Sequence, residues 1–487
     1  MAKRVKFKLN GQEIEADEGR LVIDAAKDAG VEIPHYCYHP ALGNPGNCRM
    51  CIVEVAGAPK PQVSCRTAVR EGLDVKSDSE IAKRAQASAL ELHLVNHPLD
   101  CPVCDQSGEC GLQDYYMKVG QYQSQVRENK QHKGKRIVAG PHVMLDQERC
   151  VLCTRCTRFV DTVTKTHELG IFGRGHSERI EVTPGKVLDN DYSGNVVDIC
   201  PVGALTDRDF RYKVRVWYLD KTDSICPGCS RGCNISVHTN TKRPWHNDGK
   251  RVARLKPRHN PDVNGHWMCD EGRYGFGSLD ADRLGRVLRM TPQKQDVSWD
   301  TAAGEIAAGL DGAVAVVASG MLSNEDWAAA KSLFAGAKFY FTPEPDQVGA
   351  EDALLKKKDK VPNLKGAENM GLKSGSFDEL AKDLEAGKIS TLYVLERDLG
   401  QIWGEDKAKA LVAKASLSVF QGPNKCAVSE SFRYRLPATA YVEETGHFTN
   451  CDGKVQEYKK ALDPIGEAKP DWEIFGLIAK ARTGVPA

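Results

Sequence analysis

The first residues of the chain alternate between polar and apolar side chains. Residues 4–9 read Arg-Val-Lys-Phe-Lys-Leu, the two-residue period of a strand with one buried face. Asn10-Gly11 follows and residues 13–16 alternate again, which predicts a hairpin closed by a tight turn. A short helix is expected over residues 21–29. The pattern therefore predicts a strand–strand–helix unit at the start of the chain.

A second, longer helix is predicted after residue 77. Ser77 and Glu80 have the spacing of a capping box, in which the two side chains bind free amides of the first helical turn. Four apolar residues would share one face of this helix: Ile81, Ala85, Ala89 and Leu92. Proline disfavours helical geometry in the residue before it, so the helix should end before Pro98.

Two basic stretches follow, and the pattern of apolar residues changes in the last part of the chain. Residues 128–136 are polar throughout and predict a solvated connector; a nucleic-acid-binding patch is the alternative, but no aromatic residues are interleaved. Residues 356–360 are interpreted in the same way. Beyond about residue 290, Ala-rich helical patterns alternate with short continuous apolar runs such as residues 313–318. Such runs predict an α/β region with a buried parallel sheet.

Length and composition narrow the class of protein. A chain of 487 residues predicts roughly three or more domains. Lys and Arg number 67 against 66 Asp and Glu, so no net field attracts nucleic acid or acidic lipid. No apolar run approaches the roughly 18 residues of a membrane span, and the first residues lack the apolar core of a signal peptide, so we expect the chain to stay inside the cell.

The distribution of cysteine is the strongest compositional signal. Cellular thiols are kept reduced, so 17 cysteines are poorly explained as disulfides. All but two lie in residues 1–270, and the exceptions are Cys426 and Cys451, which we interpret as buried or incidental thiols. The first half of the chain needs thiolates that the second half does not.

The first cysteine group has intervals of ten, two and thirteen residues: Cys37, Cys48, Cys51 and Cys65. Two close thiolates with two from flanking loops predict a [2Fe-2S] centre in a β-grasp frame. Gly43 and Gly46, beside Pro45, would let the backbone fold tightly and direct amide groups at sulfur. A structural zinc site is the alternative, but zinc sites more often pair two short knuckles.

The second group combines one histidine with three cysteines: His97, Cys101, Cys104 and Cys110. A [4Fe-4S] cubane usually takes four thiolates, so this group is one short. His97 lies where the predicted helix breaks and is the nearest candidate for the fourth ligand; a helix-end or buried structural histidine is the alternative. A neutral imidazole in place of a thiolate makes the cluster less negative and should raise its reduction potential, although burial opposes this.

The third group has the most informative spacing. Residues 150–156 hold three cysteines at the interval of a bacterial ferredoxin run, but the fourth position is Val160. In two-cluster ferredoxins each fourth cysteine binds the other cluster, so a second run should end downstream in Cys-Pro, and Cys200-Pro201 fits. That run lacks its other three cysteines and has in their place Asn190, Ser193 and Val196. One complete ligand set is missing and the other predicts a single cubane on Cys150, Cys153, Cys156 and Cys200.

The fourth group consists of three cysteines within eight residues and one more distant: Cys226, Cys229, Cys233 and Cys269. Three such closely spaced thiolates favour a cubane over zinc, and Cys269 is the least secure ligand because a long loop precedes it. Fifteen cysteines and one histidine then make four ligands for each of four clusters.

Several signatures of catalysis are absent from the sequence. It contains no G-x-G-x-x-G dinucleotide fingerprint, no phosphate-binding loop, no nucleophile elbow and no zinc-hydrolase helix. We expect no catalytic residue on this chain, and clusters without a substrate pocket imply one-electron relay between partners that perform the chemistry.

The cysteine motifs bring the first 290 residues close to one family. They resemble the large iron–sulfur subunits of NADH–quinone oxidoreductase, respiratory complex I. The resemblance rests on the spacing of Cys37, Cys48, Cys51 and Cys65, on the stretch His-Pro-Leu-Asp-Cys-Pro-Val-Cys-Asp-Gln-Ser-Gly-Glu-Cys at 97–110, on Cys150 to Cys156 with Cys-Pro-Val-Gly-Ala-Leu at 200–205, and on Cys-Pro-Gly-Cys-Ser-Arg-Gly-Cys at 226–233. Residues from about 220, with Glu443–Gln456 as a closing stretch, look like a shortened molybdopterin-oxidoreductase fold.

The resemblance implies a role and a location. Electrons would arrive from the flavin subunit that oxidises NADH, cross the [2Fe-2S] centre, the Cys150 cubane and the His97 cubane, and pass towards quinone. The fourth cluster would lie off that line and serve folding. The chain would belong to the peripheral arm on the cytoplasmic side of the inner membrane, bound to other peripheral-arm subunits. With the middle of the last fold contracted, neither molybdopterin nor flavin is expected on this chain.

The resemblance also implies a mixed α+β and α/β multidomain fold, whose expected parts follow in order. They are a [2Fe-2S] β-grasp ferredoxin domain (1–80), a His/Cys-ligated [4Fe-4S] domain (81–125), a degenerate two-cluster ferredoxin fold (140–212), a [4Fe-4S] domain of molybdopterin-oxidoreductase type (219–276) and a contracted α/β domain (277–487).

Three other classes fit parts of the sequence. The diaphorase arm of an NAD-coupled hydrogenase or formate dehydrogenase shares the first three cluster domains, but a formate dehydrogenase would need a full molybdenum domain and usually both cubanes of the ferredoxin pair. An iron-only hydrogenase would need further cysteines. A soluble carrier or a zinc-binding interaction module is the remaining class.

Overall fold

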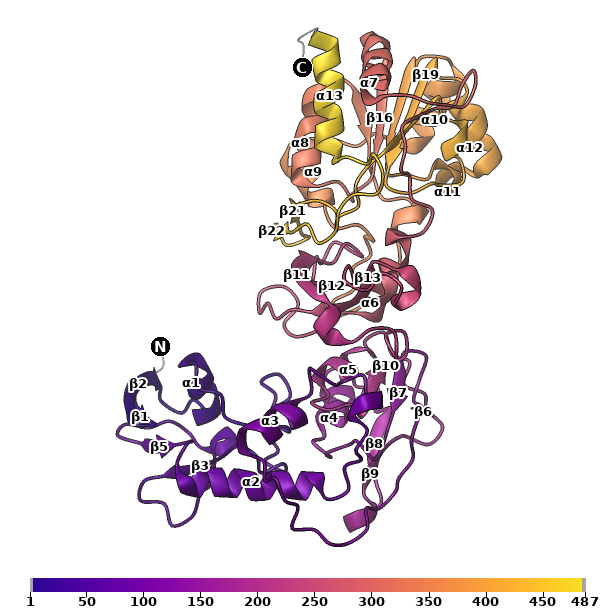
Figure 1. Cartoon of the computed structure of the whole chain (residues 1–487). Helices are drawn as coiled ribbons and strands as arrows, with labels where there is room; N and C mark the ends of the chain where they lie inside the picture. Colours follow the sequence, from indigo (N-terminus) through magenta and orange to yellow (C-terminus); the bar gives the residue numbers. More distant parts are fainter. Residues whose placement is uncertain (1–2, 484–487) are drawn as a thin grey trace. The chain divides into compact units, whose positions relative to one another are not determined.

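The computed structural model describes residues 3–483, which fall into two compact units, Met1–Tyr218 and Leu219–Ala487 (Figure 1). Each unit has its own sheets and its own hydrophobic core, so each is described by itself. No helix among residues 3–483 combines the length and the apolar content that crossing a bilayer requires.

The first unit begins with a five-stranded sheet in the order β2-β1-β5-β3-β4. Its strands are β1 (Arg4–Leu9), β2 (Gln12–Asp17), β3 (Ile52–Val55), β4 (Gln62–Val63) and β5 (Asp74–Lys76). The predicted hairpin is confirmed: β1 and β2 pair antiparallel from Arg4–Asp17 to Leu9–Gln12. Asn10 (φ 52°) and Gly11 (φ 82°) form the turn, because both adopt the left-handed conformation that a two-residue hairpin needs. Helix α1 (Val22–Asp28) packs on this sheet.

Helix α2 (Glu80–Leu94) ends before Pro98 as predicted, but its cap and its buried face differ from the prediction. Ser79, not Ser77, caps the helix by accepting from the Ala82 amide, while Ser77 bonds with Asn10. The predicted apolar face is wrong because Ile81 and Leu92 are 43% and 76% exposed. The buried residues of α2 are instead Ala82, Gln86, Ala89 and Leu90. The Gln86 side chain donates to the Ile52 carbonyl, so a hydrogen bond replaces apolar contact on that face.

The rest of the first unit consists of short elements around loops. They are α3 (Gly111–Val119), β6 (Ile137–Val138), β7 (Val143–Leu145), α4 (Arg155–Thr162), β8 (Leu169–Phe172), β9 (Arg179–Val182), α5 (Asn195–Ile199) and β10 (Leu205–Asp207). Strands β10, β7 and β6 form one sheet, and β8 pairs with β9. Three of the residues that replace the missing ferredoxin ligands are fully buried: Val160, Ser193 and Val196.

The basic stretch 128–136 has no regular secondary structure, as predicted, but it is fixed by specific contacts. The ammonium group of Lys130 donates to the carbonyl oxygens of Leu94 and Val95, both at 2.9 Å, at the end of α2. Lys135 forms ion pairs with Asp100 at 2.7 Å and Glu148 at 2.8 Å. The positive charges therefore serve internal contacts, which gives the connector a defined path beside the second ligand group.

The second unit begins with a small sheet in the order β11-β12-β13 and includes a separate hairpin. The elements are β11 (Asp220–Ile225), β12 (Asn234–Thr239), β13 (Val252–Pro257), α6 (Asp270–Tyr274), β21 (Gly446–Thr449) and β22 (Val455–Tyr458). Ile225 packs with Phe448 and Tyr458, so the hairpin from the end of the chain completes the core of the small sheet.

A seven-stranded sheet forms the core of the second unit, and five consecutive strands at one end of it are parallel, as predicted. In sheet order it contains β15 (Gln295–Asp296), β14 (Leu288–Arg289), β20 (Tyr434–Pro437), β19 (Leu417–Gly422), β18 (Thr391–Leu395), β16 (Val314–Ala318) and β17 (Lys338–Tyr340). The predicted apolar run 313–318 supplies β16. All five residues of β18 are buried, as a strand covered on both faces requires.

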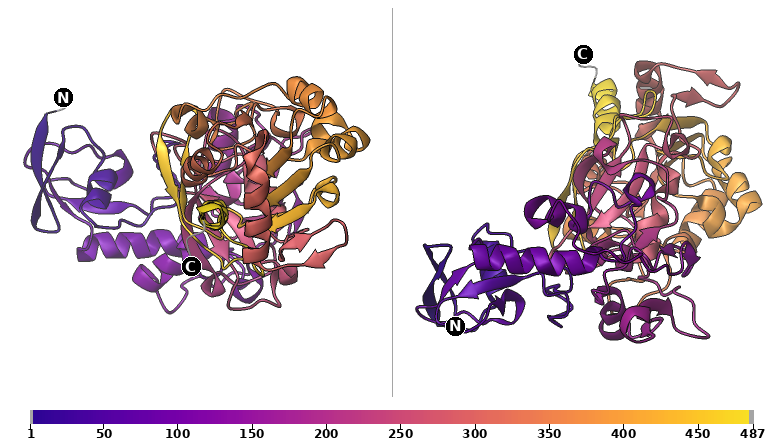
Figure 2. Two further views of the ribbon diagram at one scale, coloured as in Figure 1. Left: turned by 90° about the horizontal axis from the view of Figure 1, so that it is seen from above. Right: turned by 60° about the horizontal axis from the view of Figure 1, so that its bottom comes forward.

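Helices cover both faces of this sheet (Figures 1 and 2). Val316 and Ala318 of β16 face a core with α7 (Trp299–Ala308), α8 (Asn324–Leu333) and α13 (Asp471–Thr483). Ala315 and Val317 face the opposite core, with α10 (Phe377–Glu385), α11 (Leu399–Trp403) and α12 (Glu405–Val412). Helix α9 (Leu364–Asn369) packs beside α8. Successive side chains of one strand point to opposite faces, which produces these two layers.

Candidate iron–sulfur cluster sites

The first cysteine group lies in the loops beside the N-terminal sheet, and all four thiols are buried: Cys37, Cys48, Cys51 and Cys65. Cys37 is hydrogen-bonded to Cys48, and Cys51 to Cys65. Donation from the Cys48 thiol lowers the pKa of Cys37 and raises that of Cys48. The Tyr36 amide donates to the Cys48 sulfur at 3.5 Å, and the amides of Gly46 and Asn47 further lower the pKa of Cys37. Gly46 has a φ of 74°. The loop therefore directs amides at sulfur, as a site for a negatively charged cluster requires.

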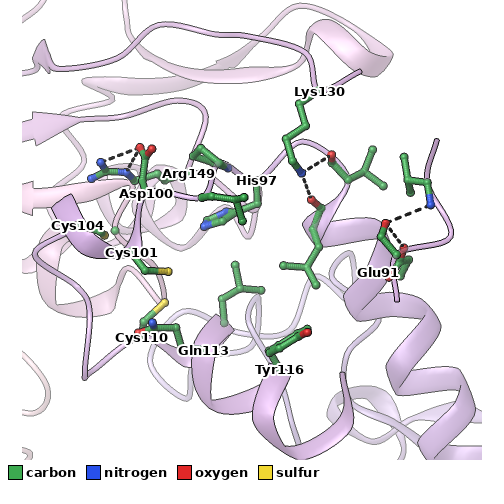
Figure 3. A pocket seen from close by; sticks show the side chains of 18 of the residues that line it. Glu91, His97, Asp100, Cys101, Cys104, Cys110, Gln113, Tyr116, Lys130 and Arg149 are labelled. Carbon is green, nitrogen blue, oxygen red and sulfur yellow. Dashed lines mark hydrogen bonds and ion pairs between the residues drawn. The ribbon is translucent and has the colours of Figure 1, made fainter. Parts of the chain in front are cut away.

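The second group lines a cavity of about 680 Å³ between α2, α3 and the connector (Figure 3). Its four predicted ligands all reach this cavity: His97, Cys101, Cys104 and Cys110. Cys101 is exposed, whereas Cys104 and Cys110 are buried. Gly203 closes one wall, since a Cβ there would lie 2.2 Å from the Cys104 sulfur. Only a glycine fits beside this thiol.

The imidazole of His97 fits the role of a neutral ligand. Burial lowers its pKa to about 4, and the charges of Lys130 and Arg149 act in the same direction. Its Nδ1 atom is buried and has no hydrogen-bond partner in the described part of the chain. A buried polar atom without a partner is costly, and a metal bond would satisfy it. His97 as a cluster ligand stays a prediction.

The third group surrounds a narrow pocket between α4, α5 and β10, lined by Cys150, Cys153, Cys156 and Cys200 together with apolar side chains. Leu152 and Thr154 have φ values of 51° and 61°, so the chain winds tightly through the first three cysteines. Burial raises the pKa values of all four thiols. They would stay protonated on their own, so bound iron would have to supply the compensating positive charge.

The fourth group lies at the start of the second unit and is buried throughout: Cys226, Cys229, Cys233 and Cys269. The Cys226 amide donates to the Cys233 carbonyl at 2.8 Å, which closes the loop between them. Cys269 lies at the N-terminus of α6, and the Cys226 and Cys269 thiols interact electrostatically. The long loop before Cys269 therefore returns it to the other three. Gly272 follows, where a Cβ would lie 2.7 Å from the Cys226 sulfur.

Two cysteines stay outside these groups. Cys426 packs partly buried beside a hydrophobic core, and Cys451 lies next to Ser230, whose carbonyl binds its amide. Within residues 3–483 no three His, Cys, Asp or Glu side chains converge as a single metal ion requires. In a cubane each thiolate binds a different iron, so its ligands need not converge.

Two arginines of α4, which the sequence analysis did not single out, join the first and third groups. Arg158 donates to the carbonyl oxygens of Cys37, of Leu42 at 2.5 Å and of Cys153 at 3.4 Å. Arg155 donates to the carbonyls of Tyr38 at 2.5 Å and Ile199 at 3.2 Å. The only sequence signal for them was their position beside ligand cysteines, since guanidinium groups that bind backbone carbonyls leave no motif.

A separate cavity of about 260 Å³ lies in the second unit and is lined by Lys360 and five carboxyl groups: Glu271, Asp326, Glu396, Glu444 and Asp471. Burial and the neighbouring Asp326 raise the pKa of Glu396 to about 8, and burial likewise raises that of Glu444 to about 8. Glu396 has a φ of 52°, so its backbone adopts the left-handed conformation. This cavity suits a neutral or cationic group better than an anionic one.

Five family models match consecutive parts of the chain. They describe a 2Fe-2S iron-sulfur cluster binding domain (residues 2–80), an NADH-ubiquinone oxidoreductase-G iron-sulfur binding region (86–125), the ferredoxin-like domain of NADH-quinone oxidoreductase subunit 3 (140–206), a molybdopterin oxidoreductase Fe4S4 domain (219–281) and a molybdopterin oxidoreductase (347–481). Their order confirms the predicted fold class.

Curated relatives share these parts. A subunit of the NADH-quinone oxidoreductase of Rickettsia conorii is 29% identical over 98% of this chain and 87% of its own length. The corresponding subunit of Rickettsia bellii is 40% identical over 62% of this chain and 43% of that protein. The mitochondrial NADH-ubiquinone oxidoreductase 78 kDa subunit of Neurospora crassa is 41% identical over 62% and 40%.

A solved structure is also similar in sequence. A chain of an NAD+-reducing [NiFe]-hydrogenase is 33% identical, over 44% of this chain and 91% of that chain, with a TM-score of 0.40.

Proposed function

The chain belongs to the family of the large iron–sulfur subunit of NADH-quinone oxidoreductase, or complex I, and from this membership we propose how it carries electrons. Electrons enter from a subunit that oxidises NADH on flavin and leave towards quinone. They pass through the Cys37 site, the Cys150 site and the His97 site, in that order. The site of Cys226 lies off this path and serves folding.

The observation that carries this proposal is the grouping of sixteen side chains into four sets of four. The proposed ligands of the [2Fe-2S] cluster are Cys37, Cys48, Cys51 and Cys65. Three [4Fe-4S] clusters have as proposed ligands His97, Cys101, Cys104 and Cys110; Cys150, Cys153, Cys156 and Cys200; and Cys226, Cys229, Cys233 and Cys269. Such clusters, when bound, supply centres that accept and give up single electrons. The chain's own part is to hold the thiolates, most of them buried, and to keep His97 neutral.

The domain boundaries follow the ligand sets: 1–80, 81–125, 140–212, 219–276 and 277–487. The last domain holds no molybdopterin in this proposal, and the chain holds no flavin. Support comes from the five carboxyl groups that line the second-unit cavity, because they outnumber its one lysine, Lys360, and disfavour the phosphate of a pterin cofactor.

The partners in this proposal are the flavin subunit and the other peripheral-arm subunits of the complex. The chain would lie on the cytoplasmic side of the inner membrane and reach the membrane only through them. The three proposed clusters on the electron path all lie in the first unit, so we expect that unit to make those contacts.

Metal analysis and low-temperature electron paramagnetic resonance of the reduced protein test the proposal. One two-iron and three four-iron clusters give brown protein with about fourteen irons per chain, and the resonance separates the two cluster types. Colourless protein with bound zinc would contradict the relay. Copurification with membrane-bound NADH dehydrogenase activity distinguishes a complex I subunit from a soluble carrier or a hydrogenase arm, which would not copurify with it.

A further inference from the structure

Arg149 lines the same cavity as the four residues of the second group, although it belongs to none of the ligand sets (Figure 3). Its side chain is almost fully buried, with 4% of the residue exposed. Atoms Nε and Nη2 donate to one carboxylate oxygen of Asp100, at 3.0 and 2.9 Å. Asp146 lies 3.4 Å from Nε. Two sides of the guanidinium are therefore held by carboxylates.

The third nitrogen of Arg149 is unused. Nη1 is buried and has no hydrogen-bond partner among residues 3–483. Leaving a buried donor unpaired is costly, and more so when the group is charged. Lys135 binds Asp100 at 2.7 Å and Asp146 at 3.3 Å, so the carboxylates that grip Arg149 are themselves fixed. The network holds the guanidinium rigidly and leaves one donor free.

The Arg149 side chain packs close to the predicted ligand Cys104. A Cβ on Gly203 would be 2.2 Å from the Cys104 sulfur and 3.7 Å from Cδ of Arg149, so the thiol and the arginine pack against the same glycine. A positive charge and an N–H group next to a cluster sulfur both stabilise the added electron of the reduced state.

We propose that Arg149 sets the reduction potential of the His97 site, by donating from Nη1 to the sulfur atoms of a cluster bound there and by its positive charge. The inference rests on the proposed function, because it assumes a cluster on His97, Cys101, Cys104 and Cys110. Reduction adds one electron and forms or breaks no covalent bond, so a fixed cation acts only on the potential. Arg149 and the neutral His97 shift it in the same direction.

The test is a redox titration of the purified holoprotein, followed by electron paramagnetic resonance of the His97-site cluster. Arg149→Met should lower the midpoint potential while the iron content stays at the wild-type level. Arg149→Lys keeps the positive charge but loses the planar guanidinium, so the midpoint potential of the cluster should fall less in this variant. Arg215→Met is a matched control, because the guanidinium of Arg215 is already bound to the carbonyl oxygens of Cys104 and Pro102. Its potential should change far less than that of Arg149→Met.

A second variant keeps the inference testable if Arg149→Met fails to fold. Asp100→Asn removes a negative charge beside Arg149 and should raise the potential. The role of Arg149 would be overturned if Arg149→Met kept its iron and the wild-type potential. It would also be overturned if the potential were unchanged in both Arg149→Lys and Asp100→Asn. Absence of any iron–sulfur signal from the wild-type protein would instead refute the proposed function itself.

Discussion

The guanidinium of Arg158 on α4 donates a hydrogen bond to the carbonyl oxygen of Cys37, in the loop that follows α1. The same nitrogen donates to the Cys153 carbonyl at 3.4 Å, so one side chain contacts the backbone of two predicted ligands from different groups. The first and third sites are therefore joined through a fixed side chain and not only through the packing of separate domains.

Arg158→Met should destabilise the contact between the first and third sites. Methionine fills similar volume but leaves several partly buried carbonyls without a donor, at a cost of about 1–3 kcal/mol. Urea unfolding of the holoprotein, followed by loss of the visible cluster absorbance, should show a lower midpoint. Arg70→Met, a change at an exposed arginine of the first unit, is the control. Equal midpoints for the two variants would contradict the bridging role.

Loss of a ligand on the proposed path should separate two activities of the complex. Cys153→Ala or Cys104→Ala should abolish NADH-to-quinone transfer, while NADH oxidation by an artificial acceptor at the flavin is retained. Cys426→Ala changes a thiol outside the four groups and should leave both activities intact. Normal quinone reduction by the Cys153→Ala complex would show that the relay assignment is wrong.

Two glycines three residues apart offer a matched pair at the fourth site. A Cβ at Gly272 would lie 2.7 Å from the Cys226 sulfur, whereas a Cβ at Gly275 has no atom within 4 Å. Gly272→Ala should displace the thiol, lower the iron content by about four atoms per chain and reduce assembly of the complex. Gly275→Ala should preserve both. Full iron content in Gly272→Ala would remove Cys226 from the proposed ligand set.

The stability of the second unit should depend on pH through Glu396. Its pKa is about 8 in the folded chain against an ordinary 4.5, so folding takes up a proton between these values and stability falls as pH rises through that window. Glu396→Gln removes this loss. We expect its melting temperature to exceed that of the wild-type chain by a few degrees at pH 8 and to match it near pH 4.5. A constant difference at both pH values would argue against an ionising Glu396.

The elements that the sequence predicted well are those with a strong local pattern. The hairpin of β1 and β2 follows from alternation and Asn10-Gly11, and β16 follows from a continuous apolar run. Helix α2 was located but its buried face was not, because Gln86 is buried through a hydrogen bond to Ile52 that no apolar period records.

In the candidate sites, too, the sequence predicts the residues of a local pattern and misses those brought in by the tertiary fold. Cysteine spacing was sufficient to propose four ligand groups, and the structure brings the members of each group together. The supporting residues could not be found, since Arg149 and Arg158 act on atoms far away in the sequence. Gly203 and Gly272 matter only because another loop passes close to them. These contacts depend on the tertiary fold.

The buried side chains of Val160, Ser193 and Val196 limit the routes that an electron could take through the ferredoxin-like fold. Hydrocarbon and hydroxyl groups have no accessible redox state, so this flank of the ferredoxin-like fold is an electrical insulator. In the proposed relay, an electron at the Cys150 site therefore has no second centre within the same fold to which it could be lost. Close packing in place of a second cluster would therefore leave the proposed path unbranched at this point.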